Sequence, residues 1–174
     1  MRGVYAEIEG LLTHDHHFWL QRSSFGTEEG DLDLAKNFAE QARALAPDDP
    51  YVRTHWAYAT LKRASRLPDD PLAPQHVAAA FAELDEAIEQ RGRIDAYAFH
   101  VYGSQGLAWV NRAHLSADER ATPLQILRRV VGEGLELHPT RRDLRQLVRD
   151  LETACLRLAI SEPVRSQDLS EARS

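Results

Sequence analysis

The sequence predicts an all-α protein of 174 residues. Apolar residues recur at helical spacing, and no stretch alternates apolar and polar residues for long, as a half-buried strand would. Turn and cap residues such as Gly30, Asp31, Asp49 and Pro50 separate the periodic segments by very short connections. Because short connections make neighbouring helices antiparallel, we expect about seven helices arranged as hairpins.

The first expected element is a helix over residues 4–12. Val4, Ile8, Leu11 and Leu12 share one side of it. This helix precedes the first complete hairpin, so it is either a cap or the second helix of a pair whose first helix is missing.

The first complete hairpin is expected between Trp19 and Pro47. Gly30 can adopt the positive φ that ends a helix, and Asp31 can cap the next helix by accepting backbone N–H bonds. In that next helix, two alanines lie two turns apart on one face and let a neighbouring helix approach closely. We expect this helix to cover residues 32–46, with Ala35 and Ala42 as the close-contact pair and Leu34, Phe38, Ala42 and Leu45 as the apolar stripe.

These positions resemble a tetratricopeptide repeat. In that motif a Trp opens the first helix, a Gly-Asp turn ends it, two alanines one heptad apart face the partner helix, and a Pro closes the unit. The corresponding residues here are Trp19, Gly30, Asp31, Ala35, Ala42 and Pro47. The resemblance implies a short tetratricopeptide-like solenoid over residues 1–160, whose usual role is to hold another protein.

The second hairpin repeats the pattern with a longer connection. A helix over residues 51–67 carries the adjacent bulky and small residues Trp56 and Ala57. Three prolines between residues 68 and 74 require a loop, because they cannot all occupy one helix. The following helix, over residues 75–90, again has two alanines seven apart, Ala80 and Ala87.

The third hairpin carries glycines inside its first helix, expected over residues 94–110. Gly103 and Gly106 each cost about 1 kcal/mol relative to Ala, so they indicate close helix contact or a bend. Two capping boxes follow, which predict a short turn and then a helix over residues 123–137. The capping residues are Ser116 with Glu119, and Thr122 with Pro123 and Gln125.

A last helix is expected after a cap formed by Thr140 and Asp143. One side is apolar through Cys155 and Leu158, and the other carries arginines between Arg141 and Arg157. A solenoid needs a polar outer face at its end, so this helix is expected to be the C-terminal cap. Residues 161–174 have almost no apolar content and are expected to be a disordered tail.

Composition excludes several classes of function. The net charge of −6 disfavours nucleic acid, because phosphate binding needs clustered Lys and Arg. The sequence contains neither a long apolar run nor a signal segment, so we expect no membrane association and a cytoplasmic location. The single cysteine, Cys155, cannot form an internal disulfide and fits a reducing compartment.

Catalytic and cofactor motifs are not found. The sequence has no H-E-x-x-H, P-loop or G-x-S-x-G pattern. The cluster from His14 to His17 contains the densest set of metal-ligand types, but Asp15 at a helix start is better explained as a cap. We therefore expect a non-catalytic protein without cofactor or metal. Further residues that could line a pocket, but at helical spacing are more typical of a core, are Tyr97, His100, Tyr102 and His114.

The partner-binding surface is inferred from the resemblance. In tetratricopeptide repeats it lies on the first helices of the hairpins, away from the Trp and alanine contacts. Chaperone-binding members clamp a terminal carboxylate with a Lys and an Asn; Leu20 and Ser24 stand near those places here, so no such clamp is expected. The residues that the resemblance places on or near the groove are His17, Gln21, Ser24, Glu28, Tyr51, Thr54, His55, Tyr58 and Lys62.

Two alternatives remain open from the sequence. The runs from His17 to Arg22 and from Pro50 to Thr54 resemble helical C-terminal regions of bacterial anti-phage effector proteins, over about the first third of the chain. This favours a sensor or oligomerisation module that packs against an effector domain or forms a homo- or hetero-oligomer. The second alternative is a helical metal-binding protein or enzyme that uses the histidines.

Overall fold

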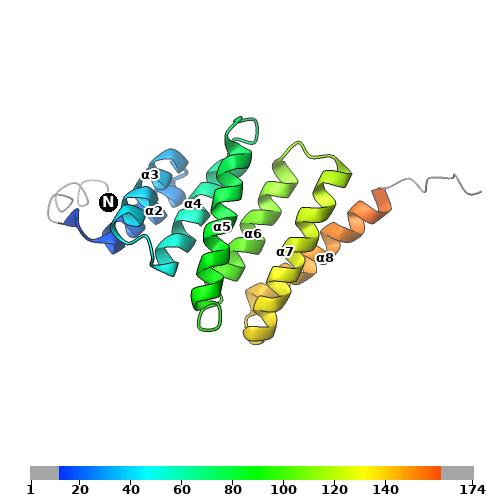
Figure 1. The fold of residues 1–174 in the computed structure, drawn as a ribbon. Coiled ribbons are helices and arrows are strands. Elements are labelled where there is room, and N and C mark those ends of the chain that lie inside the picture. The colour runs from blue at the N-terminus through cyan, green and yellow to red at the C-terminus, as the bar shows by residue number, and fades with distance from the viewer. Residues whose placement is uncertain (1–11, 162–174) are drawn as a thin grey trace, which may run out of the picture.

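The computed structural model describes residues 12–161, and side chains as far as residue 158. In this part of the chain, seven α-helices pack in sequential antiparallel pairs and no strand occurs (Figure 1). The helices are α2 (His16–Glu29), α3 (Leu32–Leu45), α4 (Pro50–Arg66), α5 (Ala73–Arg91), α6 (Tyr97–Arg112), α7 (Ala117–Leu137) and α8 (Arg142–Ser161).

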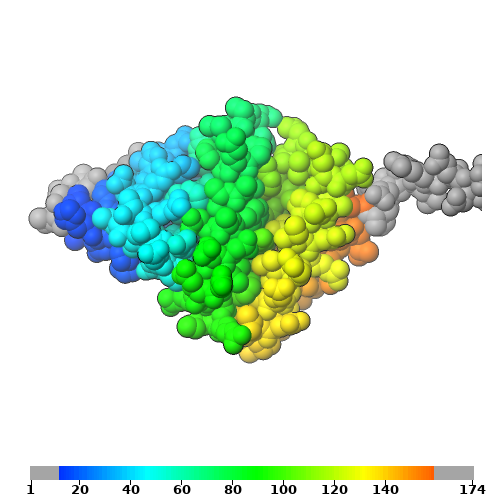
Figure 2. Space-filling model, viewed as in Figure 1, coloured from blue at the N-terminus to red at the C-terminus, as the bar shows by residue number. Residues whose placement is uncertain are grey.

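The helices form two layers. Each helix packs on the next one in sequence, and α4 also contacts both α2 and α6, while α6 contacts α8. We call α2, α4, α6 and α8 the even-numbered layer, and α3, α5 and α7 the odd-numbered layer. In Figure 2 the odd-numbered layer faces the reader, with α3, α5 and α7 side by side.

The predicted caps of α2, α3 and α4 are confirmed, whereas α5 begins at Ala73 and includes Pro74, which was expected to lie in the preceding loop. Asp15 accepts a hydrogen bond from the backbone N–H of His17 at 2.8 Å, and Asp31 and Asp49 cap the next two helices in the same way. Gly30 ends α2 with φ at 82°. Each cap satisfies a backbone donor that the first turn of a helix leaves without a partner.

The close contact in the first hairpin is made by small residues, as predicted. Ala35 and Ala42 are fully buried. Opposite them, Gly26 in α2 lies so near α3 that an added Cβ would be 3.1 Å from the backbone nitrogen of Ala35. The two helix backbones therefore approach more closely than larger side chains would allow.

The predicted apolar stripe of α3 is wrong in register. Leu34 and Leu45 are 36% and 41% exposed, whereas the deeply buried positions are alanines that include Ala39. Phe38 is half-buried and its ring stacks on Trp19 at 5.6 Å between centroids. The helix turns its smallest residues toward its neighbours because a face of alanines packs nearer than a face of leucines.

The glycines of the third hairpin mark close helix contacts, as predicted. A Cβ on Gly103 would lie 2.4 Å from Cγ2 of Val131, and a Cβ on Gly134 would lie 2.5 Å from Cγ of Phe99. Neither position could hold a side chain without displacing α6 from α7. Glycine thus plays the part in this hairpin that alanine plays in the first two.

Three predicted boundaries in the second half are wrong. Helix α6 begins at Tyr97, and Ile94 lies before it, 76% exposed. The Ser116–Glu119 capping box is confirmed, but the helix that it starts runs on through Pro123, so Thr122 is not a cap. Packing of the α7 core outweighs the one backbone hydrogen bond that a proline cannot donate.

The third wrong boundary is that of α8, which begins at Arg142 rather than directly after Thr140. Leu144, Leu147 and Leu151 are buried against α6 and α7, whereas Leu156 and the arginines are exposed. The expected N-terminal helix and the expected tail lie outside the described residues, apart from Leu12 and Ser161. Among the described helices, none has the length and apolar character needed to cross a membrane.

Candidate partner-binding groove

An open groove of about 520 Å³ lies between α2 and α4 in the even-numbered layer. We call it the α2/α4 groove. It brings together six residues that the sequence predicted to face a partner. They are His17, Gln21, Ser24 and Glu28 from α2 and Tyr51 and His55 from α4, and Leu20 and Phe25 complete the lining.

Helical spacing places the α2 residues on one face. His17, Gln21, Ser24 and Glu28 follow one another at intervals of three and four residues, which aligns their side chains. The opposite side of α2 is fixed by Trp19, whose Nε1 donates to the backbone oxygen of Thr13 at 3.0 Å. Because α2 is held from that side, the polar row points into the groove.

The polar groups in the groove are available for binding. Gln21, Ser24 and Glu28 form no side-chain hydrogen bond or ion pair within the described residues. Their amide, hydroxyl and carboxylate can therefore bond to a ligand without breaking an internal contact. A segment of a partner's backbone presents N–H and C=O groups at regular spacing, and these three side chains can form hydrogen bonds with them.

Aromatic rings form the α4 side of the groove. Tyr51 is 41% exposed and meets His55 edge-on, with 4.5 Å between ring centroids. Tyr97 of α6 lies 5.3 Å from His55 and 6.0 Å from Tyr51. The three rings join α4 to α6 and hold Tyr51 in place without burying it.

Burial keeps the His55 ring neutral at pH 7. Desolvation lowers the pKa of His55 to about 4, and Nε2 of this residue is buried without a hydrogen-bond partner in the described part of the chain. Desolvation and the neighbouring tyrosines Tyr51 and Tyr58 raise the pKa of Tyr97. The α4 side of the groove is thus uncharged and aromatic, while Glu28 adds a carboxylate from α2.

Three predicted residues do not line the groove. Thr54 is buried, its Oγ1 donates to the backbone oxygen of Pro50 at 2.7 Å, and it faces the crevice between α4, α5 and α6. Its predicted position on the surface is therefore wrong. Tyr58 and Lys62 are half-buried and bond to each other at 3.1 Å, outside the groove.

Two residues that line the groove, Leu20 and Phe25, were missed from the sequence. Phe25 lies four residues after Gln21 on the same face of α2, so helical spacing could have identified it. Tyr97, which contacts Tyr51 from outside the groove lining, was expected to be a core residue. It comes from the next hairpin, and its contact with Tyr51 depends on how α6 packs against α4.

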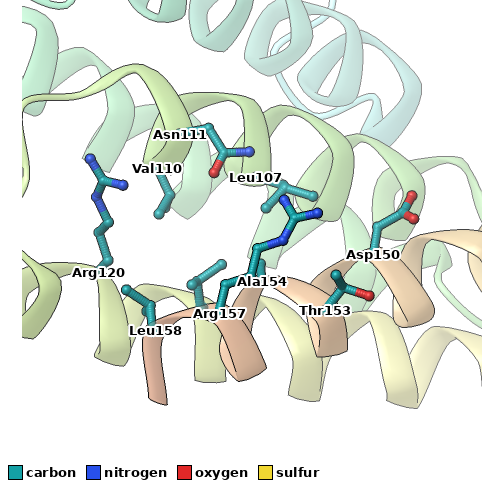
Figure 3. A pocket seen from close by; sticks show the side chains of 10 residues that line it. Leu107, Val110, Asn111, Arg120, Asp150, Thr153, Ala154, Arg157 and Leu158 are labelled. Carbon is teal, nitrogen blue, oxygen red and sulfur yellow. The ribbon is translucent and has the colours of Figure 1, made fainter. Parts of the chain in front are cut away.

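A second hollow of about 480 Å³ lies at the other end of the even-numbered layer, between α6, α7 and α8. Figure 3 shows Asp150, Thr153 and Arg157 on α8 facing Leu107 and Asn111 of α6. Positively and negatively charged side chains, among them Arg157 and Asp150, surround an apolar base. The even-numbered layer therefore offers two recesses, one at each end, along a single surface.

The histidines and the cysteine do not gather into a metal site among the described residues. No group of three His, Cys, Asp or Glu side chains there could hold a metal ion. His16 lies 3.8 Å from Asp49, and its ring is 4.0 Å from that of His17. Cys155 is half-buried on α8. The chemistry that the α2/α4 groove supports is binding by hydrogen bonds and aromatic contact.

No family model, curated protein or solved structure matches this chain. The function is therefore inferred from the geometry of the groove.

Proposed function

We propose that this protein is a non-catalytic interaction module that holds a segment of a partner protein in the α2/α4 groove. The observation that carries the proposal is the groove itself. It combines the side chains of Gln21, Ser24 and Glu28, which have no hydrogen-bond or ion-pair partner within the described residues, with a fixed, half-exposed tyrosine. Tyrosine is enriched among residues that carry binding energy, because it joins apolar area to a hydroxyl group at low entropic cost.

The arrangement of the helices supports a tetratricopeptide-like solenoid as the framework. The first helices of the hairpins contact one another in order, from α2 through α4 and α6 to α8. In that arrangement α8 acts as the C-terminal cap, with its arginines on the outside. The partner is another protein or an effector domain.

No observation on the α2/α4 groove specifically favours either of the two alternative functions considered from the sequence. An obligate oligomer interface is broad and apolar. The α2/α4 groove is instead polar along α2 and aromatic along α4, which favours a bound segment over a packed domain.

Photo-crosslinking in extract of the native host tests the proposal. A photoreactive amino acid in place of Ser24 is expected to capture a discrete partner, because this residue lines the groove. The same amino acid in place of Ala44, which is exposed on α3, should capture none of it. The captured protein is then titrated against the parent and against Tyr51→Ala by calorimetry.

We expect Tyr51→Ala to weaken binding by roughly 1 to 3 kcal/mol, the range of an interface anchor. Its melting temperature should stay close to that of the parent, because the ring is half-exposed. Equal affinity of Tyr51→Ala and the parent would show that the partner binds elsewhere.

A further inference from the structure

The odd-numbered layer contains a second groove, of about 470 Å³, between α5 and α7. We call it the α5/α7 groove. The two helices begin at the same end of the molecule and diverge toward that end, and α6 lies behind and between them (Figure 1). The lining residues that matter below are Pro74, Ala78 and Phe81 of α5, Trp109 of α6, and Glu119 and Ile126 of α7.

Small residues shape the base of this groove. A Cβ on Gly106 of α6 would lie 2.4 Å from Cδ2 of Leu127 and 3.1 Å from Cζ of Phe81. The rings of Phe81 and Tyr102 pack at 4.7 Å between centroids. The base is therefore well packed, and the groove above it is a surface feature rather than a defect in the core.

The sides of the groove are apolar and partly open to solvent. Ile126 is 40% exposed, and Phe81 and Trp109 are half-buried. Contiguous apolar surface of this kind is unusual on a monomer and marks an interaction site. Phe81 follows Pro74 on α5 after an interval of seven residues, or about two helical turns.

Carboxylates mark both ends of the groove. Glu119 lines the wide end, and Asp118 lies beside it in the first turn of α7. At the narrow end Asp85 follows Phe81 by one turn, and burial raises the pKa of its carboxyl group. Arg129 approaches Asp85 there but forms no ion pair with it in the described structure. The carboxylates of Asp118 and Glu119 therefore attract cations to the wide end, whereas Arg129 offsets the charge of Asp85 at the narrow end.

We propose that the α5/α7 groove receives a short amphipathic helix of a partner protein. The helix places apolar side chains one turn apart against Phe81, Trp109 and Ile126, and its Lys or Arg residues meet the carboxylates at the wide end. The two-turn length of the apolar row from Pro74 to Phe81 fits a short helix, and the acidic wide end fits a basic one. This site lies in the layer opposite the α2/α4 groove and does not depend on that proposal.

Two synthetic peptides test this proposal. The first is a short amphipathic helix with apolar residues at positions i, i+4 and i+7 and flanking lysines, and the second has every Lys replaced by Glu. Binding is followed by tryptophan emission, since Trp109 lines the groove. We expect the Lys peptide to bind saturably and to shift the tryptophan emission to the blue, and we expect this shift to be absent in Trp109→Phe. The affinity for the Glu peptide should be at least about tenfold weaker.

Two alanines of α5 provide a matched pair of variants. Ala78 and Ala79 are adjacent and exposed, but only Ala78 lines the groove. We expect Ala78→Gln to weaken the Lys peptide by about tenfold or more and Ala79→Gln to leave its affinity unchanged. Both variants should have the same melting temperature as the parent.

Two results would overturn the proposal. One is equal binding of the Lys peptide to Ala78→Gln and the parent, or equal binding of the two peptides. The other is concentration-dependent dimerisation of the parent, seen by sedimentation, that Ala78→Gln abolishes. That result would assign the groove to a second copy of the chain.

Discussion

The odd-numbered layer has two junctions between consecutive helices, and they are built differently. At the α3/α5 junction, Glu83 of α5 accepts hydrogen bonds from Arg43 of α3 and, at 2.8 Å, from Arg53 of α4. The guanidinium of Arg43 also lies 4.4 Å from the centre of the Trp56 ring. At the α5/α7 junction, no ion pair joins the two helices in the described part of the chain.

The two junctions differ in whether charged side chains cover the apolar residues between the helices. The charged side chains at the α3/α5 junction cover Trp56, which is 6% exposed. The corresponding space between α5 and α7 is lined by Phe81, Trp109 and Ile126, with charges only at its ends. The first junction therefore contributes to the stability of the fold, and the second leaves apolar surface exposed.

The largest expected effect compares the two tryptophans. Trp56→Ala removes a buried ring and the platform for Arg43, and we expect it to lower the free energy of unfolding by about 3–5 kcal/mol. Trp109→Ala removes a half-buried ring at the open junction, and we expect a loss below about 2 kcal/mol. Urea unfolding of both variants measures the difference. Equal losses would mean that the two junctions are equally important for stability.

A smaller effect is expected at the carboxylate that bridges the α3/α5 junction. Glu83→Gln keeps the shape of the side chain but removes its charge, so Arg43 and Arg53 lose their shared anion. Because the Glu83 side chain is only 14% exposed, we expect a loss of about 1–3 kcal/mol in urea unfolding.

The control for this variant is Glu86→Gln, an exposed position on the same helix, where we expect a change within about 0.5 kcal/mol. Similar small changes for both variants would show that the charges at the α3/α5 junction add nothing to stability.

The smallest effect has the opposite sign and concerns Asp85 at the open junction. Burial raises the pKa of this carboxyl group above its ordinary value of 3.8. Above the raised pKa the charged form therefore costs stability, and this cost disappears as the pH falls through the folded-state pKa. We expect Asp85→Asn to raise the free energy of unfolding at pH 7 by no more than about 0.5 kcal/mol, because the side chain is partly solvated.

Unfolding of Asp85→Asn and the parent across a series of pH values tests this sign. The gain should shrink as the solution is acidified toward the folded-state pKa. A loss of stability at pH 7 would instead show that Asp85 and Arg129 pair across the groove, so that the α5/α7 junction is bridged as well.

Local signals in the sequence determined the fold class, the caps of α2, α3 and α4, and most residues of the α2/α4 groove. Asp15, Asp31 and Asp49 each cap the helix that directly follows, and a cap is a contact between neighbours in sequence. The row from His17 to Glu28 faces one way because helical spacing requires it. Such features follow from residues a few positions apart.

Tertiary packing determined several features that the spacing of residues in the sequence could not predict. It turned α3 so that alanines rather than Leu34 and Leu45 face the core, and it buried Thr54 while leaving Tyr51 half-exposed. It also carried α7 through Pro123. In each case the local preference is worth about 1–3 kcal/mol, and the summed contacts of a whole helix face exceed it.

The two grooves show most clearly which features follow from the sequence and which depend on tertiary packing. The α2 row was visible in the sequence, but the contact between Tyr51 and Tyr97 depends on α6 packing against α4. The α5/α7 groove has no signature in the sequence, because it arises where two helices that are distant along the chain diverge over a third. The angle between helices is set by which side chains interlock, here at Gly103 and Gly106, and a one-dimensional pattern does not record it.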